Sequence, residues 1–261
     1  MLLVIDIGNT NTTLGFIKGK EIVFEFRVGT NENRTSDELT ATLNEITSIN
    51  DLSRKDVNDA IIASVVPNLV YPWTSAIKKY FKIKALVVGE GTKTKIPIKI
   101  ENPKSLGADR IVNAVGAIRK YGYPVIVVDL GTATTFDVVN SNGEYIGGSI
   151  APGIQITSDA LFTRTAKLPT IELRKPERAI AKNTPEAMNS GIVYGYVGLI
   201  DAIIKQILEE LKQMGEDVEN IPIISTGGYS SLLTTSSKYI NTIDRNLTLN
   251  GLRIIYENTT K

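Results

Sequence analysis

The sequence contains no cysteine and no histidine among its 261 residues. Without cysteine, disulfides, thiolate zinc sites and cysteine nucleophiles are excluded. Without histidine, a Ser-His-Asp triad, a histidine general base and histidine-bound metals are excluded as well. Any acid–base step must therefore use a carboxylate, lysine, tyrosine or water, and any metal must be a hard cation held by oxygen atoms.

A charge excess and a long apolar run are also missing. Lysine and arginine number 29 and aspartate and glutamate 28, which gives a net charge of +1. This balance gives no general attraction to nucleic acid or to an anionic membrane. No apolar stretch approaches the roughly 20 residues of a membrane-spanning helix, and no basic segment precedes the short apolar run at residues 1–5. We therefore expect a cytoplasmic protein that contacts neither nucleic acid nor membrane.

The chain contains an internal repeat. Residues 2–17 read LLVIDIGNTNTTLGFI and residues 125–140 read VIVVDLGTATTFDVVN. In each copy an apolar strand leads into Asp-x-Gly, a second apolar strand and a glycine-containing hairpin signal. A constant offset aligns Val4 with Val127, Asp6 with Asp129, Gly8 with Gly131 and Thr12 with Thr135. Two unrelated hairpins could share Asp-x-Gly by chance, but the matching flanks favour two similar domains, residues 1–117 and 118–261.

The remaining sequence alternates helical and strand patterns, which predicts an α/β fold. The capping box of Thr35 and Glu38 predicts a helix to residue 49, and Thr184 before Pro185 predicts the cap of a long helix ending at Gly215. Further helices are expected at 69–81 and 106–120, and further strands at 60–66, 85–88 and 221–225.

The two Asp-x-Gly loops have the chemistry of phosphate sites. Glycine lets backbone approach a ligand, and N–H groups with Asn and Thr side chains can donate to phosphate oxygens. Asp6 and Asp129 would then hold a cation beside the phosphates, most simply Mg²⁺. Asp137 also lies near, although strand alternation could turn it to either face. The alternative for the first loop is a plain hairpin turn, with Asp6 bonded to backbone amides.

A third candidate segment is Gly-Ala-Asp-Arg at residues 107–110, which opens a predicted helix. A helix N-terminus favours anions, and Arg110 could pair with a substrate carboxylate. Asp109 could accept a proton from a substrate hydroxyl in a chain that lacks histidine. The alternative is a surface aspartate that complements the helix dipole, with Arg110 solvated.

Together these motifs resemble the type III pantothenate kinase family of the acetate and sugar kinase, heat-shock chaperone and actin superfamily. The resemblance runs along nearly the whole chain, although Lys95 stands where the family has a glycine. It implies two duplicated RNase H-like domains with an ATP cleft between them. The segments that carry it are DIGNTN at 6–11, ENP at 101–103, GADRIVNA at 107–114, DLGTATTFD at 129–137, GGSIAPG at 147–153, residues 183–191 and TGG at 226–228.

The resemblance implies ATP-dependent phosphorylation of pantothenate, the first step toward coenzyme A. It implies a homodimer that uses Mg²⁺ with ATP and a monovalent cation, K⁺ or NH₄⁺, bound by Asp129. Asp109 would be the proton acceptor. The ATP-binding residues would be Asp6, Ile7, Gly8, Asn9, Thr10, Asn11, Thr12, Thr13 and Thr132, and the pantothenate-binding residues Gly107, Ala108, Asp109, Arg110 and Thr184.

Three other functions fit parts of this pattern. An RNase H-like metal-dependent nuclease would need three or four clustered carboxylates and a basic face. A non-enzymatic transcriptional accessory factor related to this family would be expected to have lost Asp109, Asp129 or the first loop, and all are present. A sugar kinase would often carry a zinc site of cysteine and histidine, which this chain cannot form.

Overall fold

A computed structural model describes residues 1–89 and 91–261, and the chain falls into two compact units. The first unit consists of Met1–Lys95, Lys104–Gly116 and Asn246–Lys261, and the second of Ile96–Pro103 and Ala117–Arg245. The predicted boundary after residue 117 separates the two copies of the sequence repeat, and the division into these two units does not test it.

The first unit is built on a five-stranded sheet in the order β3-β2-β1-β4-β5. The strands β1, β2 and β3 pair antiparallel, whereas β4 and β5 run parallel to β1. Its strands are β1 Leu2–Ile7, β2 Asn11–Lys18, β3 Glu21–Gly29, β4 Asp59–Ser64 and β5 Ala85–Val87, and its helices are α1 Ser36–Ile49, α2 Pro67–Phe81, the first part of α3 Ala108–Tyr121 and α7 Leu247–Thr260.

The second unit repeats this arrangement with the order β8-β7-β6-β9-β10. Again the first three strands are antiparallel, and the last two are parallel to the first. The same strand order in both halves confirms the predicted α/β duplication. The elements are β6 Val125–Leu130, β7 Ala133–Val139, β8 Tyr145–Pro152, β9 Ile223–Thr226, β10 Thr242–Ile243, α4 Ile154–Thr163, α5 Thr184–Gln213 and α6 Ser230–Leu233.

Helices cover both faces of the first sheet, which explains why β1 is apolar along nearly its whole length. Leu3, Ile5 and Ile7 belong to the core cluster that includes buried residues of α1 and α2. On the opposite face α7 packs on β1 and β4, and a Cβ on Gly15 would meet the Leu249 side chain at 3.0 Å. Asp6 thus lies near the end of a strand that is packed on both faces.

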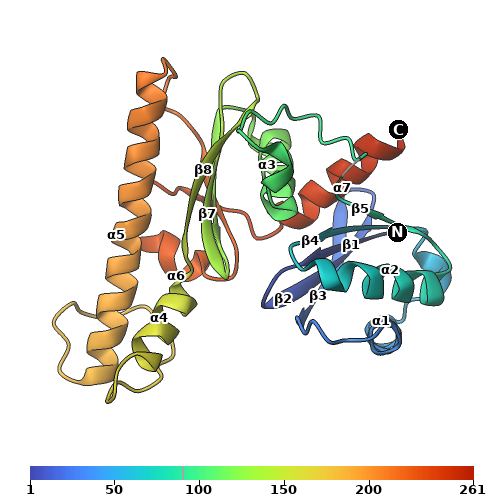
Figure 1. Cartoon of the computed structure of the whole chain (residues 1–261), viewed down its shortest axis with the longest axis horizontal. Helices are drawn as coiled ribbons and strands as arrows, with labels where there is room; N and C mark the ends of the chain where they lie inside the picture. The colour runs from blue at the N-terminus through green and yellow to red at the C-terminus, as the bar shows by residue number, and fades with distance from the viewer. Residues whose placement is uncertain (90) are drawn as a thin grey trace. The chain divides into compact units, whose positions relative to one another are not determined.

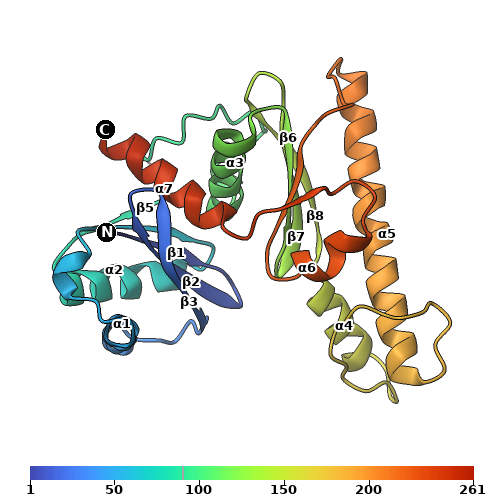
Figure 2. The same cartoon turned by 180° about the vertical axis from the view of Figure 1, so that it is seen from behind.

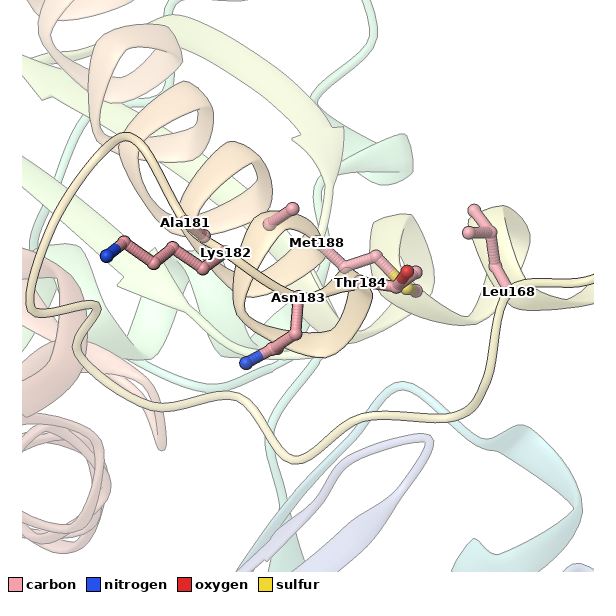
Figure 3. A pocket seen from close by; sticks show the side chains of 7 residues that line it. Leu168, Ala181, Lys182, Asn183, Thr184 and Met188 are labelled. Atoms are coloured by element: carbon pink, nitrogen blue, oxygen red, sulfur yellow. The ribbon is translucent and has the colours of Figure 1, made fainter.

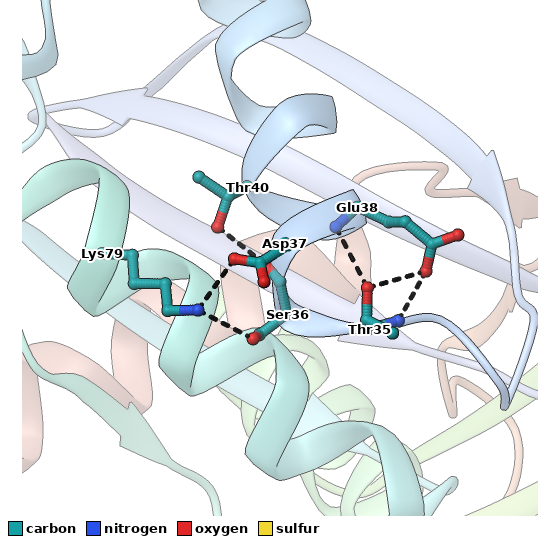
Figure 4. A network of polar contacts seen from close by, with 6 residues as sticks. All are labelled: Thr35, Ser36, Asp37, Glu38, Thr40 and Lys79. Atoms are coloured by element: carbon teal, nitrogen blue, oxygen red, sulfur yellow. Dashed lines mark hydrogen bonds and ion pairs between the residues drawn. The ribbon is translucent and has the colours of Figure 1, made fainter.

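The start of α1 shows how the sequence sets a helix end (Figure 4). The Glu38 N–H donates to the Thr35 hydroxyl at 3.3 Å, and the Thr35 N–H donates to the Glu38 carboxylate at 2.7 Å. This reciprocal pair is the predicted capping box. The Lys79 ammonium from α2 reaches Asp37 at 2.8 Å, and it joins the two helices at the surface.

The long helix α5 lies along the second sheet in both views (Figures 1 and 2). Val193, Tyr196 and Ile200 pack with Phe136 and Val138 of β7 in one core cluster. By length and composition α5 could cross a membrane, but core helices of soluble proteins pass the same test. Of its apolar window 39% is buried in the structure, and one face of the helix packs in the core of the second unit.

Three helix starts differ from the sequence expectation, and one of them is α3, which begins at Ala108 rather than at residue 106. The helix expected from residue 69 begins at Pro67, because proline fits the first turn, where its missing N–H leaves no bond unmade. The cap of α5 is Asn183 rather than Thr184, since the Asn183 side chain accepts the Glu186 N–H at 3.0 Å. Thr184 is therefore the first helical residue and does not perform the capping role.

Strand register corrects one pair of the internal repeat. Ile7 lies opposite Thr12, and Leu130 lies opposite Thr134. The second loop is thus one residue shorter than the first, and Thr12 corresponds to Thr134 rather than to Thr135. Both of these threonines are only 1% exposed, which agrees with the corrected pairing.

Candidate functional site

The first Asp-x-Gly loop is a tight turn between β1 and β2. The Gly8 N–H donates to the Asn11 carbonyl at 3.0 Å, and a Cβ on Gly8 would lie 3.0 Å from that same oxygen. The turn therefore leaves little room for a side chain at residue 8. It presents Asn9, Thr10 and Asn11 at the surface, as expected of residues that donate to a ligand.

A partly buried pair of threonine hydroxyls supports this loop. The Thr30 hydroxyl donates to the Gly8 carbonyl at 2.7 Å and lies 2.9 Å from the Thr12 hydroxyl. Because the single Thr30 proton goes to Gly8, Thr12 must be the donor to Thr30. The Thr12 side chain thus links β2 to the residue after β3. Among the residues predicted to bind ATP, Thr12 therefore supports the loop from within the fold.

Asp6 and Thr13 lie directly opposite each other on β1 and β2. Directly opposed residues of an antiparallel pair share one face, with Cβ atoms about 4.5–5.5 Å apart. A carboxylate and a hydroxyl are thus adjacent at the carboxyl end of β1. Their oxygens are the ligand type that Mg²⁺ prefers.

The second loop closes against the start of α4. The Gly131 N–H donates to the Ala133 carbonyl at 3.1 Å, and the Gly153 N–H donates to the Thr132 carbonyl at 3.1 Å. A Cβ on Gly153 would collide with the Thr132 carbonyl and lie 2.6 Å from the Gly131 carbonyl. Glycine at residue 153 thus allows β8 to seat the loop, and Thr132 is exposed at its tip.

Asp129 ends β6 in a position that matches Asp6 at the end of β1. Its carboxylate lies close to the backbone of Gly227, where a Cβ would approach Oδ1 to 2.5 Å. Thr135 lies opposite Asp129 on β7, and Thr226 lies beside it on β9. A carboxylate with two neighbouring hydroxyl side chains offers the oxygen ligands that a monovalent or divalent cation needs.

Asp137 lies on the same sheet face as Asp129 and is 0% exposed. Its two carboxylate oxygens accept the Thr135 hydroxyl at 3.0 Å and the Tyr145 hydroxyl at 2.6 Å. The structure therefore shows which sheet face the Asp137 side chain takes, a question that strand alternation alone left open. Both hydroxyls donate to the carboxyl group of Asp137, which orients the Thr135 hydroxyl next to Asp129.

Asp109 occupies the first turn of α3. Its Oδ1 accepts the Arg110 N–H at 2.9 Å, and the carboxylate folds back so closely that a Cβ on Gly107 would collide with it. Burial raises the pKa of the Asp109 carboxyl, while the Arg110 N–H bond and the Arg110 charge partly oppose that rise. A carboxylate with a raised pKa is a stronger base than an ordinary surface aspartate.

Thr184 lies on the rim of an open hollow of about 510 Å³ (Figure 3). Residues from the preceding loop and from the first turn of α5 line this hollow. Its lining is Leu168, Ala181, Lys182, Asn183, Thr184, Ala187 and Met188. The only charged side chain of this lining is Lys182, a cation suited to an acidic ligand.

The predicted site residues are divided between the two units. Asp6, the loop residues 7–13 and residues 107–110 belong to the first unit, and Asp129, Thr132 and Thr184 belong to the second. Within the described ranges 1–89 and 91–261, no group of three or more carboxylates is arranged to hold a metal.

Comparison with known proteins identifies the family of this chain. The family model for type III pantothenate kinases matches residues 2–206. A type III pantothenate kinase of Finegoldia magna is 51% identical over 255 residues, which cover 98% of this chain and 96% of that protein. The chain belongs to the type III pantothenate kinase family. The resemblance seen in the sequence motifs is thereby confirmed.

Solved structures support the fold of this type III pantothenate kinase family member. A protein of Campylobacter jejuni described as a Baf family transcriptional activator matches with a TM-score of 0.59 at 19% identity, over 98% of this chain and 97% of that one. MreB 5 of Spiroplasma citri, solved with AMPPNP, matches with a TM-score of 0.58 at 14% identity, over 98% and 96% of the two chains. At these identities the likeness shows the actin-like fold alone, and it confirms the predicted fold class.

Sequence reasoning missed some residues that shape these loops. Gly153 was part of a family motif, but its contact with the second loop depends on the β7–β8 pairing. Nothing in the sequence distinguishes Tyr196 within its helix, yet its hydroxyl reaches β7 and the end of β8. Only the assembled sheet and helix bring these residues to the loop.

Proposed function

We propose that this chain transfers the γ-phosphoryl group of ATP to the primary hydroxyl of pantothenate, and so forms 4′-phosphopantothenate at the start of coenzyme A synthesis. The observation that carries the assignment is 51% identity to a type III pantothenate kinase over nearly the full length of both chains. The presence of the Asp-x-Gly loops and of Asp109 agrees with an active kinase rather than a non-enzymatic relative.

In this proposal the ATP phosphates bind to residues 7–13 and to Thr132, and Asp6 interacts with them through the divalent cation. The turn at Gly8 and the turn at Gly131 both place exposed short polar side chains at strand ends. Phosphoryl transfer requires mainly positioning and charge neutralisation. Two rigid loops that donate hydrogen bonds supply the positioning part of that requirement.

Pantothenate is held by residues 107–110 and by Thr184. Its carboxylate pairs with the Arg110 guanidinium, whose planar donor geometry suits a carboxylate. Asp109 takes the proton from the substrate hydroxyl as that oxygen attacks the γ-phosphorus, and ADP leaves. The raised pKa that burial gives Asp109 supports its role as the base.

ATP use in this fold implies a divalent cation, here Mg²⁺, and we further propose K⁺ or NH₄⁺ at Asp129. The donor chemistry fits hard cations, because the side chains beside Asp6 and Asp129 are threonine hydroxyls. Each cation, when bound, would neutralise negative charge on the phosphates. Asp6 would serve the divalent cation and Asp129 the monovalent one.

We also propose that the chain works as a cytoplasmic homodimer with pantothenate bound near the dimer interface. This proposal rests on the family resemblance, on a net charge of +1 and on the place of α5 in the core. Sedimentation equilibrium of the purified chain tests it, since a fully active monomer would refute a site shared between subunits.

The proposed activity predicts turnover that needs both pantothenate and a monovalent cation. With ATP and Mg²⁺, ADP release should appear only when pantothenate is added, and mass spectrometry should find one phosphate on its primary hydroxyl. Replacing KCl by NaCl at equal ionic strength should lower turnover, while an analogue without the primary hydroxyl should remain unphosphorylated. Equal ADP release with and without pantothenate would contradict the proposal.

Binding of the monovalent cation is tested separately from turnover. KCl should raise the melting temperature of the wild type above its value in NaCl, because a ligand that binds only the folded state stabilises it. Asp129→Asn should remove that difference. If wild type and variant respond equally to KCl, Asp129 is not the cation ligand.

A further inference from the structure

We infer that Tyr196 of α5 is a positioning residue for the second phosphate loop, a role that acts through hydrogen bonds and without contact to the substrates. The inference rests on the proposed function, because it assumes that Thr132 contacts ATP. Tyr196 is 3% exposed and lies about three helical turns beyond Thr184 on the same helix. Its ring packs in the core of the second unit, and its hydroxyl extends to the strand ends beside the loop.

The Tyr196 hydroxyl joins β7, which follows the loop, to β8, which leads into the glycine that contacts the loop. It lies 2.6 Å from the Pro152 carbonyl at the end of β8 and 2.6 Å from the Thr134 hydroxyl near the start of β7. A carbonyl only accepts, so the single Tyr196 proton goes to Pro152 and Thr134 must donate to Tyr196. The direction of both bonds is therefore fixed, and the hydroxyl is used as donor and acceptor at once.

Pro152 leads directly into the contact that seats the loop. The next residue, Gly153, donates its N–H to the Thr132 carbonyl at 3.1 Å and admits no side chain there. On β7, Thr134 directly follows residues 131–133. Tyr196 thus holds the residue that follows the loop and the residue before the glycine that contacts Thr132.

Three observations separate this arrangement from ordinary core packing. The ring of Tyr196 would fill the core equally well as phenylalanine, so the hydroxyl has a role beyond filling volume. Removing it would leave the Pro152 carbonyl and the Thr134 hydroxyl without their buried partner, which is unfavourable. The corresponding threonine of the first loop, Thr12, is also held by a hydroxyl, that of Thr30. Both halves therefore tie this threonine to another element, but only the second half uses a helix.

The test is Tyr196→Phe, with Tyr194→Phe as the matched control. Tyr194 lies on the same helix, is 43% exposed, and its hydroxyl reaches only the Pro176 carbonyl at 3.3 Å. We expect Tyr196→Phe to raise the KM for ATP about five-fold, a ratio typical of one lost hydrogen bond. The KM for pantothenate should stay within about two-fold, and Tyr194→Phe should match the wild type in both constants.

A second variant tests whether the effect comes from the hydrogen-bond relay, which runs from Thr134 through Tyr196 to Pro152, or from a general loosening of the core. Thr134→Val removes the other hydroxyl of the relay, and the double variant should bind ATP about as weakly as Tyr196→Phe alone, because the two residues act as one unit. Titration with a fluorescent ATP analogue should show the same loss without any turnover.

Each outcome decides one question. An inactive wild type would refute the proposed function, whereas an active wild type with an unchanged KM for ATP in Tyr196→Phe would refute only this inference. A lower melting temperature with both KM values unchanged, or with both raised alike, would show a merely structural hydroxyl and would also overturn it.

Discussion

Asp109→Asn should lower turnover with pantothenate about 10²- to 10⁴-fold, the usual contribution of a general base. The substitution keeps the shape of the side chain at the start of α3 but removes the group that takes the hydroxyl proton. Steady-state kinetics at saturating ATP measures this directly. The matched control is Asp37→Asn, because Asp37 also lies in the first turn of a helix but is exposed and paired with Lys79.

The same variant should be at least as stable as the wild type at neutral pH. Burial raises the pKa of Asp109 in the folded chain above its unfolded value. The stability linked to this group is therefore full below the unfolded pKa and is lost as pH rises through the folded pKa. At pH 7 the wild type bears that loss and the asparagine variant does not, so its melting temperature should not fall.

The pH dependence of kcat/KM follows from the same shift. Activity should fall as pH drops through the raised pKa of Asp109, since the protonated carboxyl cannot accept a proton. The acid limb should therefore lie above 3.8, the ordinary value for aspartate. Unaltered turnover in Asp109→Asn, or loss of activity in Asp37→Asn of the same size, would contradict the role of Asp109 as base.

Gly227→Ala should destabilise the second unit by about 2–5 kcal/mol and should reduce turnover with it. Gly227 has φ +91, a left-handed conformation that costs an alanine about 1–2 kcal/mol. Its new Cβ would lie 2.5 Å from the Asp129 Oδ1 and 2.6 Å from the Leu130 carbonyl carbon. Overpacking of this kind adds about 1–3 kcal/mol. Denaturant unfolding measures the stability, and the KCl-dependent rise in melting temperature reports on Asp129.

The neighbouring glycine is the control for this prediction. Gly228 has no atom within 4 Å of a Cβ position and lies outside the left-handed region. Gly228→Ala should therefore change stability by no more than about 0.5 kcal/mol, as surface substitutions usually do. Equal losses of stability in the two variants would mean that reduced backbone flexibility, and not the contact with Asp129, destabilises this turn.

Features that depend on neighbours in sequence could be predicted well. The repeated order of strand, turn, strand and hairpin follows from apolar runs separated by glycine turns, and both sheets show it. The capping box at Thr35 and Glu38 involves residues only three apart. Lys95, which stands where the family has a glycine, does have φ +58, so the backbone there keeps the conformation that glycine favours.

Features that depend on register or on distant contacts could not be predicted. A one-residue difference in loop length shifts the correspondence from Thr135 to Thr134, and only strand pairing shows it. Asn183 and Thr184 are both suitable caps, so composition alone could not choose between them. The bond from Tyr196 to Pro152 spans 44 residues and exists only once α5 lies on the sheet.

We propose that both Asp-x-Gly loops bind one nucleotide and that Asp109 accepts the proton of the substrate hydroxyl. A crystal structure with a non-hydrolysable ATP analogue, Mg²⁺, K⁺ and pantothenate tests it most directly. We expect the analogue's phosphates to contact both residues 8–13 and Thr132, with the Asp109 carboxylate about 2.6–3.2 Å from the primary hydroxyl of pantothenate. Phosphates bound by one loop alone, or a hydroxyl facing a different carboxylate, would contradict the account.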